Sequence, residues 1–173
     1  MCLLSELILS RTLGVVGQSA GDSPGRPFPE PGAQPNYARD RGCIVTHLDI
    51  GLRIDPVAKT LVGDTTVSVA PLPSGALRVQ LDLDDVTVTA VETPEGEALP
   101  FTHGGGVLDV RGLPAGGGKV CVRYHGRPSR GLYFTGPTPA APERPPMAWS
   151  QCQDEDGHRV FPCHDAPGIK QPV

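Results

Sequence analysis

Apolar and polar residues alternate along much of the chain after residue 43. In the segment 44–54, IVTHLDIGLRI, the apolar residues Leu48, Ile50, Leu52 and Ile54 alternate with His47, Asp49, Gly51 and Arg53. A period of two predicts a β-strand with one buried face. The run 60–72, TLVGDTTVSVAPL, is rich in β-branched residues and predicts a second strand. Pro56 suits the second position of a turn between them, so the pattern predicts a β-hairpin.

Further strands are predicted by short apolar runs that Gly- and Pro-containing turns separate. These runs are ALRVQLDL (76–83), DVTVTAVET (85–93), VLDVRGL (107–113) and GKVCVRYHG (118–126). MAWSQCQ (147–153) predicts one more strand, after an extended surface connection over 136–146. No apolar stripe of helical period follows residue 40. The pattern therefore predicts an all-β fold of antiparallel sheets, as a sandwich or open barrel.

Glycine and proline change the picture at the N-terminus. The chain has 22 Gly and 20 Pro among 173 residues, and many of them lie in 18–36 and 136–146. The stretch 18–36 cannot build a core, because Gly or Pro interrupts it every few positions. We therefore expect a flexible leader over residues 1–40 and one β-domain over 41–173.

Charge, targeting signals and cysteines exclude several classes of protein. The net charge is −4 with scattered basic residues, which argues against nucleic acid as a partner. Glu6 and Arg11 interrupt the N-terminal apolar stretch, which makes a poor signal peptide and is too short to cross a bilayer. The five cysteines show no regular spacing, so we expect buried thiols and a cytoplasmic protein without membrane contact.

The richest candidate chemistry lies in residues 150–173, SQCQDEDGHRVFPCHDAPGIKQPV. Cys152, His158, Cys163 and His164 do not have the paired spacing of structural zinc sites, and neighbours such as Cys163 and His164 point to opposite faces of an extended chain. A thiolate–imidazolium pair lacks a helix N-terminus to activate the thiol. The simpler interpretation is two packed cysteines, two surface histidines and a solvated acidic turn over 154–156.

The same segment resembles the zinc aminopeptidase N family, which comprises the gluzincin aminopeptidases and their epoxide-hydrolase relatives. The matching residues are Ser150, Gln151, Cys152, Gln153, Phe161, Pro162, Cys163, Asp165, Pro167 and Lys170. Upstream, HLDIGLRIDPVAKTLVGDTTVSV resembles the opening hairpin of the family, and RGLYFTG resembles its Gly-Leu-Tyr stretch. The similarity covers about residues 37–173 in the correct order.

The resemblance implies a saddle-shaped antiparallel β-domain that lies over a separate thermolysin-like catalytic domain. The residue at the position of Gln153 then helps bind the free amine of the peptide substrate, and Gln151 lines the pocket for a substrate side chain. Many aminopeptidases have Glu at the position of Gln153, whereas epoxide-hydrolase relatives have Gln. The resemblance therefore leaves open whether the parent enzyme is an aminopeptidase or an epoxide-hydrolase relative. The other matched residues are expected to be structural, with Asp165 capping nearby backbone N–H groups.

The chain lacks the H-E-x-x-H motif that binds zinc in this family. We therefore expect no catalytic or metal-ligating residue in this chain, no cofactor bound by it, and zinc in a catalytic domain supplied in cis or in trans. The similarity covers about half of the family's N-terminal domain, which predicts an incomplete fragment with an unpaired sheet edge. The alternative is a stand-alone β-sandwich that binds a partner without peptidase activity.

Overall fold

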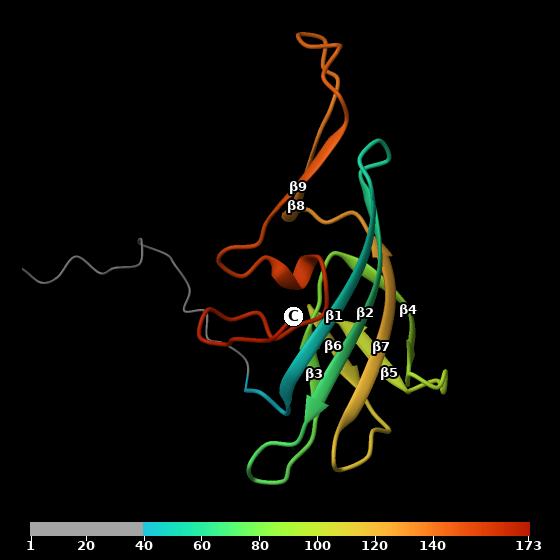
Figure 1. Cartoon of the computed structure of the whole chain (residues 1–173), viewed down its shortest axis with the longest axis vertical. Coiled ribbons are helices and arrows are strands. Elements are labelled where there is room, and N and C mark those ends of the chain that lie inside the picture. Colours follow the sequence, from blue (N-terminus) through green and yellow to red (C-terminus); the bar gives the residue numbers. More distant parts are fainter. Residues whose placement is uncertain (1–39) are drawn as a thin grey trace, which may run out of the picture. The chain divides into compact units, whose positions relative to one another are not determined.

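The computed structural model describes residues 40–173, which form three antiparallel sheets (Figure 1). The strands are β1 (Ile44–Asp55), β2 (Thr60–Ala70), β3 (Val79–Asp82), β4 (Val86–Glu92), β5 (Phe101–Gly104), β6 (Val107–Val110), β7 (Gly118–Gly126), β8 (Gly131–Thr135) and β9 (Met147–Gln151). Their orders are β1-β2-β7-β4, β3-β6-β5 and β8-β9. Within 40–173 the one helical element is the 3-10 turn η1 (Gly157–Arg159). The predicted all-β class is confirmed.

The β1–β2 hairpin forms where the alternation predicts it, but its buried face is shorter than expected. The register runs from Ile44 opposite Ala70 to Asp55 opposite Thr60, with a bulge after Val45. Leu48, near the base, is buried, whereas Leu52 and Ile54 are each 37% exposed. The prediction that all four apolar residues are buried is therefore wrong for the outer half of β1, which lies beyond the core.

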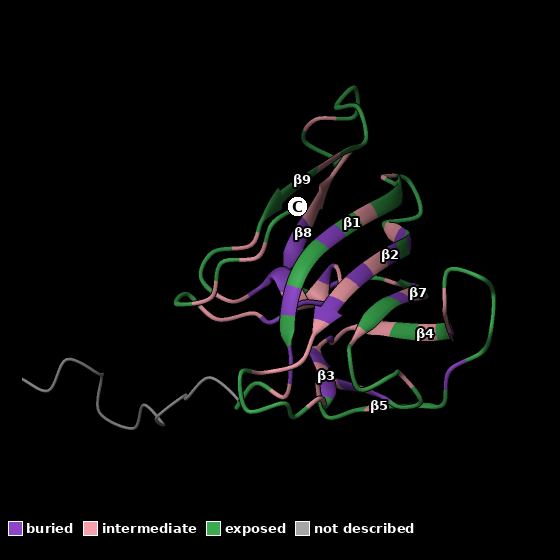
Figure 2. Ribbon diagram, turned by 60° about the horizontal axis from the view of Figure 1, so that its bottom comes forward, coloured by how far each residue is buried: buried purple, intermediate pink, exposed green. Residues whose placement is uncertain are grey.

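The core lies between the inner face of the four-stranded sheet and the three-stranded sheet. Inner positions of β2 and β7 are buried and their neighbours are not, which produces the alternating bands in Figure 2. The buried Tyr124 hydroxyl lies 2.9 Å from Oγ1 of Thr65. Burial raises the pKa of Tyr124 to about 12. A Cβ at Gly63 would lie 2.1 Å from Cζ of Tyr124, so this ring packs directly against a glycine of β2.

Two strands were not predicted from the sequence. β5 has only four residues, with little burial and no apolar alternation. β8 pairs with β9 over five residues, from Gly131 opposite Gln151 to Thr135 opposite Met147. Residues 136–146 therefore form the end of a hairpin, closed by a bridge between Thr138 and Ala141, and the predicted extended connection is wrong.

The expected leader falls, apart from Asp40, outside the described residues. In the part of the chain that is described, no helix is long and apolar enough to span a membrane. Its four cysteines are free thiols; Cys43 and Cys163 are buried, and Cys121 and Cys152 are half-buried.

Candidate functional site

The two glutamines expected to contact a substrate lie at the end of β9. Gln151 is the last residue of the strand and pairs with Gly131. Gln153 lies two residues further along, in a turn, so the strand predicted over 147–153 is shorter than expected. Both residues are exposed. The segment that carries them therefore presents two neutral amide side chains to solvent.

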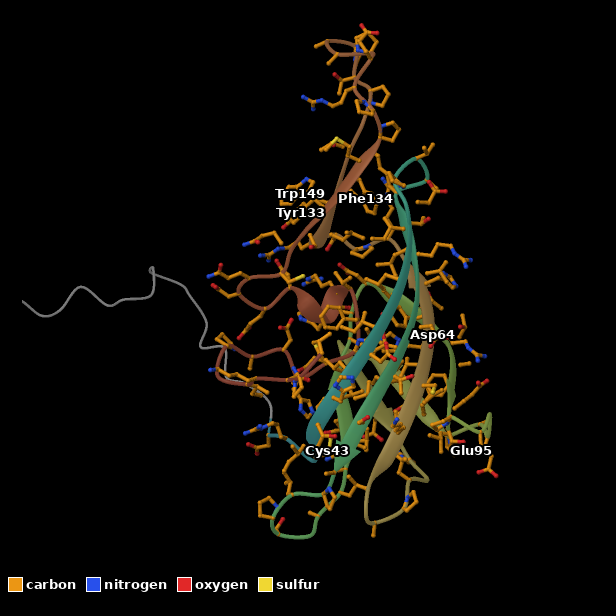
Figure 3. All side chains as sticks on the ribbon, in the orientation of Figure 1. Cys43, Asp64, Glu95, Tyr133, Phe134 and Trp149 are labelled. Carbon is orange, nitrogen blue, oxygen red and sulfur yellow. The ribbon has the colours of Figure 1, made fainter. Side chains whose placement is uncertain are left out.

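Gln151 shares one face of the β8–β9 hairpin with aromatic and apolar side chains. Strand alternation places Met147 and Trp149 on the same face as Gln151, and Tyr133 lies opposite Trp149. The Tyr133 and Trp149 rings stack, with centroids 4.5 Å apart and planes inclined by 20° (Figure 3). Trp149 is 49% exposed and Met147 is 51% exposed. We call Tyr133, Met147, Trp149 and Gln151 the aromatic face. It was not predicted from the sequence, although the aromatic residues in 131–135 and 147–151 could have indicated it.

The turn that carries Gln153 packs tightly against β8. The Asp156 N–H donates to the Cys152 carbonyl at 3.0 Å and closes the turn. The Cys152 thiol lies 3.6 Å from the Gly131 carbonyl oxygen. Gly131 has φ +79°, and a Cβ there would lie 2.4 Å from the Asp156 carbonyl oxygen. Only glycine fits this position, because it tolerates both the conformation and the close approach.

Asp156 was expected in a solvated acidic turn, and this is wrong: the residue is 4% exposed. Its carboxylate lies 3.2 Å from the Arg130 guanidinium and 3.4 Å from Nε of Arg159. Arg159 also contacts Asp84 at 3.3 Å and Asp85 at 2.9 Å. A buried carboxylate needs such cations; Arg159 is three residues away along the chain, whereas Arg130 lies on a distant segment. Arg159 thus holds the turn against the segment between β3 and β4, and Arg130 holds it beside the start of β8.

Charge and hydrogen bonding favour the ionised form of the groups around Arg159. Partial burial raises the pKa of Asp85, but hydrogen bonds from Ser129 and Arg159 outweigh it and lower that pKa overall. Burial likewise disfavours the Arg159 cation, yet Asp85, Asp84 and Asp156 raise its pKa overall. The contacts between the C-terminal segment and the β3–β4 connection are therefore charged at neutral pH.

Asp165 caps backbone N–H as the sequence predicts. Its Oδ2 accepts hydrogen bonds from the backbone N–H of His158 at 2.8 Å and from Nδ1 of the same residue at 2.7 Å. The Asp165 N–H donates to Asp82 Oδ2 at 3.0 Å. Asp82 and Cys163 exchange two backbone hydrogen bonds, at 2.7 and 3.2 Å. Asp165 therefore joins η1 to the β3 strand that covers the core.

His164 was expected at the surface, and it is buried at 5% exposure. Its Nε2 donates to the Gln80 carbonyl at 2.9 Å and lies 3.9 Å from Sγ of Cys43. The Gln171 side chain accepts from the His164 N–H at 3.0 Å and donates to its carbonyl at 2.9 Å. Burial lowers the pKa of His164, which keeps the ring neutral. Its role is structural.

The sulfur and nitrogen groups of the segment do not form a metal or nucleophile site. Among residues 40–173, no three His, Cys, Asp or Glu side chains converge on a position that could hold a metal ion. Burial, Asp165 and Asp156 raise the pKa of Cys152. Burial above all raises the pKa of Cys163 well above its usual range. Both thiols are therefore protonated at neutral pH, whereas a nucleophilic cysteine needs its thiolate.

Comparisons with known proteins identify solved structures that have a similar fold. No family model matches the chain, and no curated protein matches it significantly. The M1 zinc metallopeptidase of Deinococcus radiodurans is similar in structure, with a TM-score of 0.54 and 23% identity over 73% of this chain and 30% of that one. Leukotriene A4 hydrolase of Saccharomyces cerevisiae gives 0.63 and 18% over 82% of this chain and 25% of that one.

The chain thus spans between a quarter and a third of the solved chains that it matches. At these identities the similarity concerns the fold, and it agrees with the family resemblance read from the sequence. The described residues have the fold of the N-terminal region of the M1 zinc metallopeptidases and leukotriene A4 hydrolases.

Proposed function

We propose that this chain is the N-terminal β-domain of a zinc-dependent aminopeptidase, in which the end of β9 forms one wall of the active-site cleft. Gln153 accepts a hydrogen bond from the N-terminal ammonium of a peptide, and Gln151 contacts the adjoining side chain. The single observation that supports this is the exposure of both glutamines on a segment that buried contacts hold in place.

The chemistry of the two side chains suits recognition of an ammonium group and does not suit hydrolysis. An amide oxygen accepts a hydrogen bond from an ammonium, and a carboxylate at the same place would bind it more strongly. The residues described here do not fit a zinc ion. Zinc therefore belongs to a catalytic domain supplied in cis or in trans, and the chain alone is inactive on peptides.

A reducing compartment such as the cytoplasm completes the proposal. The four cysteines of residues 40–173 form no disulfide, which supports it, because unpaired thiols persist where the redox buffer keeps them reduced.

An NMR titration tests the role of Gln153 directly. The ligand is Tyr-Ser-Ala, the substrate held by a structure of the Deinococcus radiodurans metallopeptidase, and the control ligand is its N-acetylated form. We expect the side-chain amide signals of Gln153 and Gln151 to shift with the free tripeptide and not with the acetylated one. Gln153→Glu should strengthen binding and Gln153→Ala should abolish the difference between the two ligands.

Two results would contradict the proposal. Equal shifts with both ligands would show that the amine is not recognised and would favour the stand-alone binding module. No shift at either glutamine at millimolar peptide concentration, with the variants folded, would show that neither glutamine contacts the peptide. Gln80, which hydrogen-bonds Asp109 on the three-stranded sheet, serves as the internal reference amide.

A further inference from the structure

A second pocket lies away from the two glutamines, between the turn that joins β1 to β2 and the β8–β9 hairpin. Figure 1 shows the tip of the β1–β2 hairpin beside the β8–β9 hairpin, and residues of both line the pocket. Its volume is about 420 Å³, which suits a small organic molecule. Phe134 lines it and follows Tyr133 along β8, so the two side chains point to opposite faces of the hairpin. The pocket is therefore separate from the aromatic face.

The charged residues that line this pocket are both cations, Lys59 and Arg144. Both are exposed, and neither side chain forms an ion pair or a hydrogen bond within residues 40–173. The two nearest acids along the chain do not line the pocket: Glu143 forms no ion pair with Arg144, and Asp55 Oδ1 accepts two backbone N–H groups of its own turn at 2.9 Å each. The pocket therefore has two positive charges that no described residue balances.

Two hydroxyl groups add hydrogen-bond donors to the same pocket. Thr135 and Thr138 both line it. The Thr135 hydroxyl forms no hydrogen bond within the described part of the chain, and Thr138 Oγ1 accepts from the Ala141 N–H at 3.1 Å. A hydroxyl that accepts in this way still has its own hydrogen to donate. The polar groups of the pocket are thus suited to an acceptor that carries negative charge.

The remaining walls are apolar and stiff. Pro56, Pro137 and Pro146 line the pocket, together with the partly buried Phe134, which packs against the core. Proline fixes its own φ angle, so these walls lose little conformational freedom when a ligand binds. They offer a surface to the apolar part of a ligand.

We propose that this pocket binds a small phosphate monoester whose organic part is apolar or aromatic. The phosphate group carries about −1.5 to −2 charges at pH 7, which balances Lys59 and Arg144. Arginine binds phosphate through two parallel N–H donors, and lysine adds a point charge. A carboxylate has a single charge and leaves one cation unbalanced. The organic part packs against the prolines and Phe134.

Phenyl phosphate is the probe, because it combines a phosphate group with one ring. In an amide NMR titration of the isotope-labelled full chain, we expect the backbone signals of Lys59, Thr135 and Gly136 to shift, with a Kd below about 1 mM. Phenol lacks the phosphate and inorganic phosphate lacks the ring, so each should bind at least about tenfold more weakly. Benzoate keeps the ring and one negative charge, and it should bind more weakly than phenyl phosphate.

Two variants remove one cation each. Lys59 has φ +57°, so Lys59→Asn suits the turn, because asparagine tolerates this conformation better than most residues. Lys59→Asn and Arg144→Gln should each raise the Kd for phenyl phosphate by about fivefold or more. Lys119→Gln and Arg127→Gln remove the same charge at exposed positions outside the pocket, and both should leave the Kd unchanged. Circular dichroism should show all four variants folded.

Three results would overturn the proposal. The first is no shift at the pocket signals with about 5 mM phenyl phosphate, ten times the concentration at which a ligand with a Kd of about 0.5 mM half-saturates its site. The second is equal affinity for phenyl phosphate and inorganic phosphate, which would show that the apolar walls contribute nothing. The third is an equal loss of affinity in the pocket variants and the control variants, which would show attraction to net charge in place of a site.

Discussion

Replacing Asp165 with alanine removes the carboxylate that holds η1 beside the segment that pairs with β3. Its Oδ2 accepts two hydrogen bonds from His158, at 2.8 and 2.7 Å, and the Asp165 side chain is 15% exposed. Hydrogen bonds to charged groups contribute about 1.5–3 kcal/mol each, and partial exposure favours the lower end. We therefore expect Asp165→Ala to lower the free energy of unfolding by about 2–4 kcal/mol, a large share of the ~5–15 kcal/mol typical of a domain.

Urea unfolding followed by far-UV circular dichroism measures this loss. Asp165→Asn should lose about half as much, because the amide oxygen still accepts from the backbone N–H of His158. Asp154→Ala is the matched control: Asp154 lies in the same segment, is exposed and forms no hydrogen bond or ion pair within residues 40–173, so the change should stay within about 0.5 kcal/mol. Equal losses for Asp165→Ala and Asp154→Ala would refute this account of the segment.

Two further predictions concern the core and the response to acid. Gly63→Ala places a Cβ 2.1 Å from the buried Tyr124 ring and should cost about 3 kcal/mol in a urea titration, whereas Gly104→Ala meets nothing within 4 Å and should change stability by less than about 1 kcal/mol. Because burial lowers the pKa of His164, the unfolded chain binds this proton more readily, and the free energy of unfolding should fall as the pH drops below about 6.5. His164→Gln keeps a donor for the Gln80 carbonyl and should show a flatter curve between pH 7 and about 5.5 in the same urea titrations, and parallel curves would contradict the assignment.

The positions of the strands were largely predictable. β2, β3, β4, β6, β7 and β9 lie within the predicted segments and β1 extends beyond its own, because alternation and turn residues act over a few neighbouring positions. The resemblance to the zinc aminopeptidase N family agrees with the fold found in solved structures, since its matched residues are spaced along the whole domain.

Predictions of burial from the sequence were wrong where burial depends on residues that are distant along the chain. Leu52 and Ile54 follow the strand pattern perfectly, yet no layer formed by residues 40–173 covers the outer half of β1, and both stay exposed. Asp156 and His164 are polar, yet both are buried. The partners that make their burial tolerable lie elsewhere: Arg130 is 26 positions from Asp156, and the Gln80 carbonyl is 84 positions from His164.

By itself, the sequence determined that the chain forms short antiparallel strands, where its turns lie, and which family its C-terminal segment resembles. Only the tertiary structure decided that Asp156, Asp165 and His164 of this segment support the fold, while Gln153 and the aromatic face, which includes Gln151, are at least partly exposed. The physical reason is the distance along the chain over which each effect acts. Strand alternation arises from the local backbone, whereas burial and pairing of a polar group depend on segments that folding brings together from far along the chain.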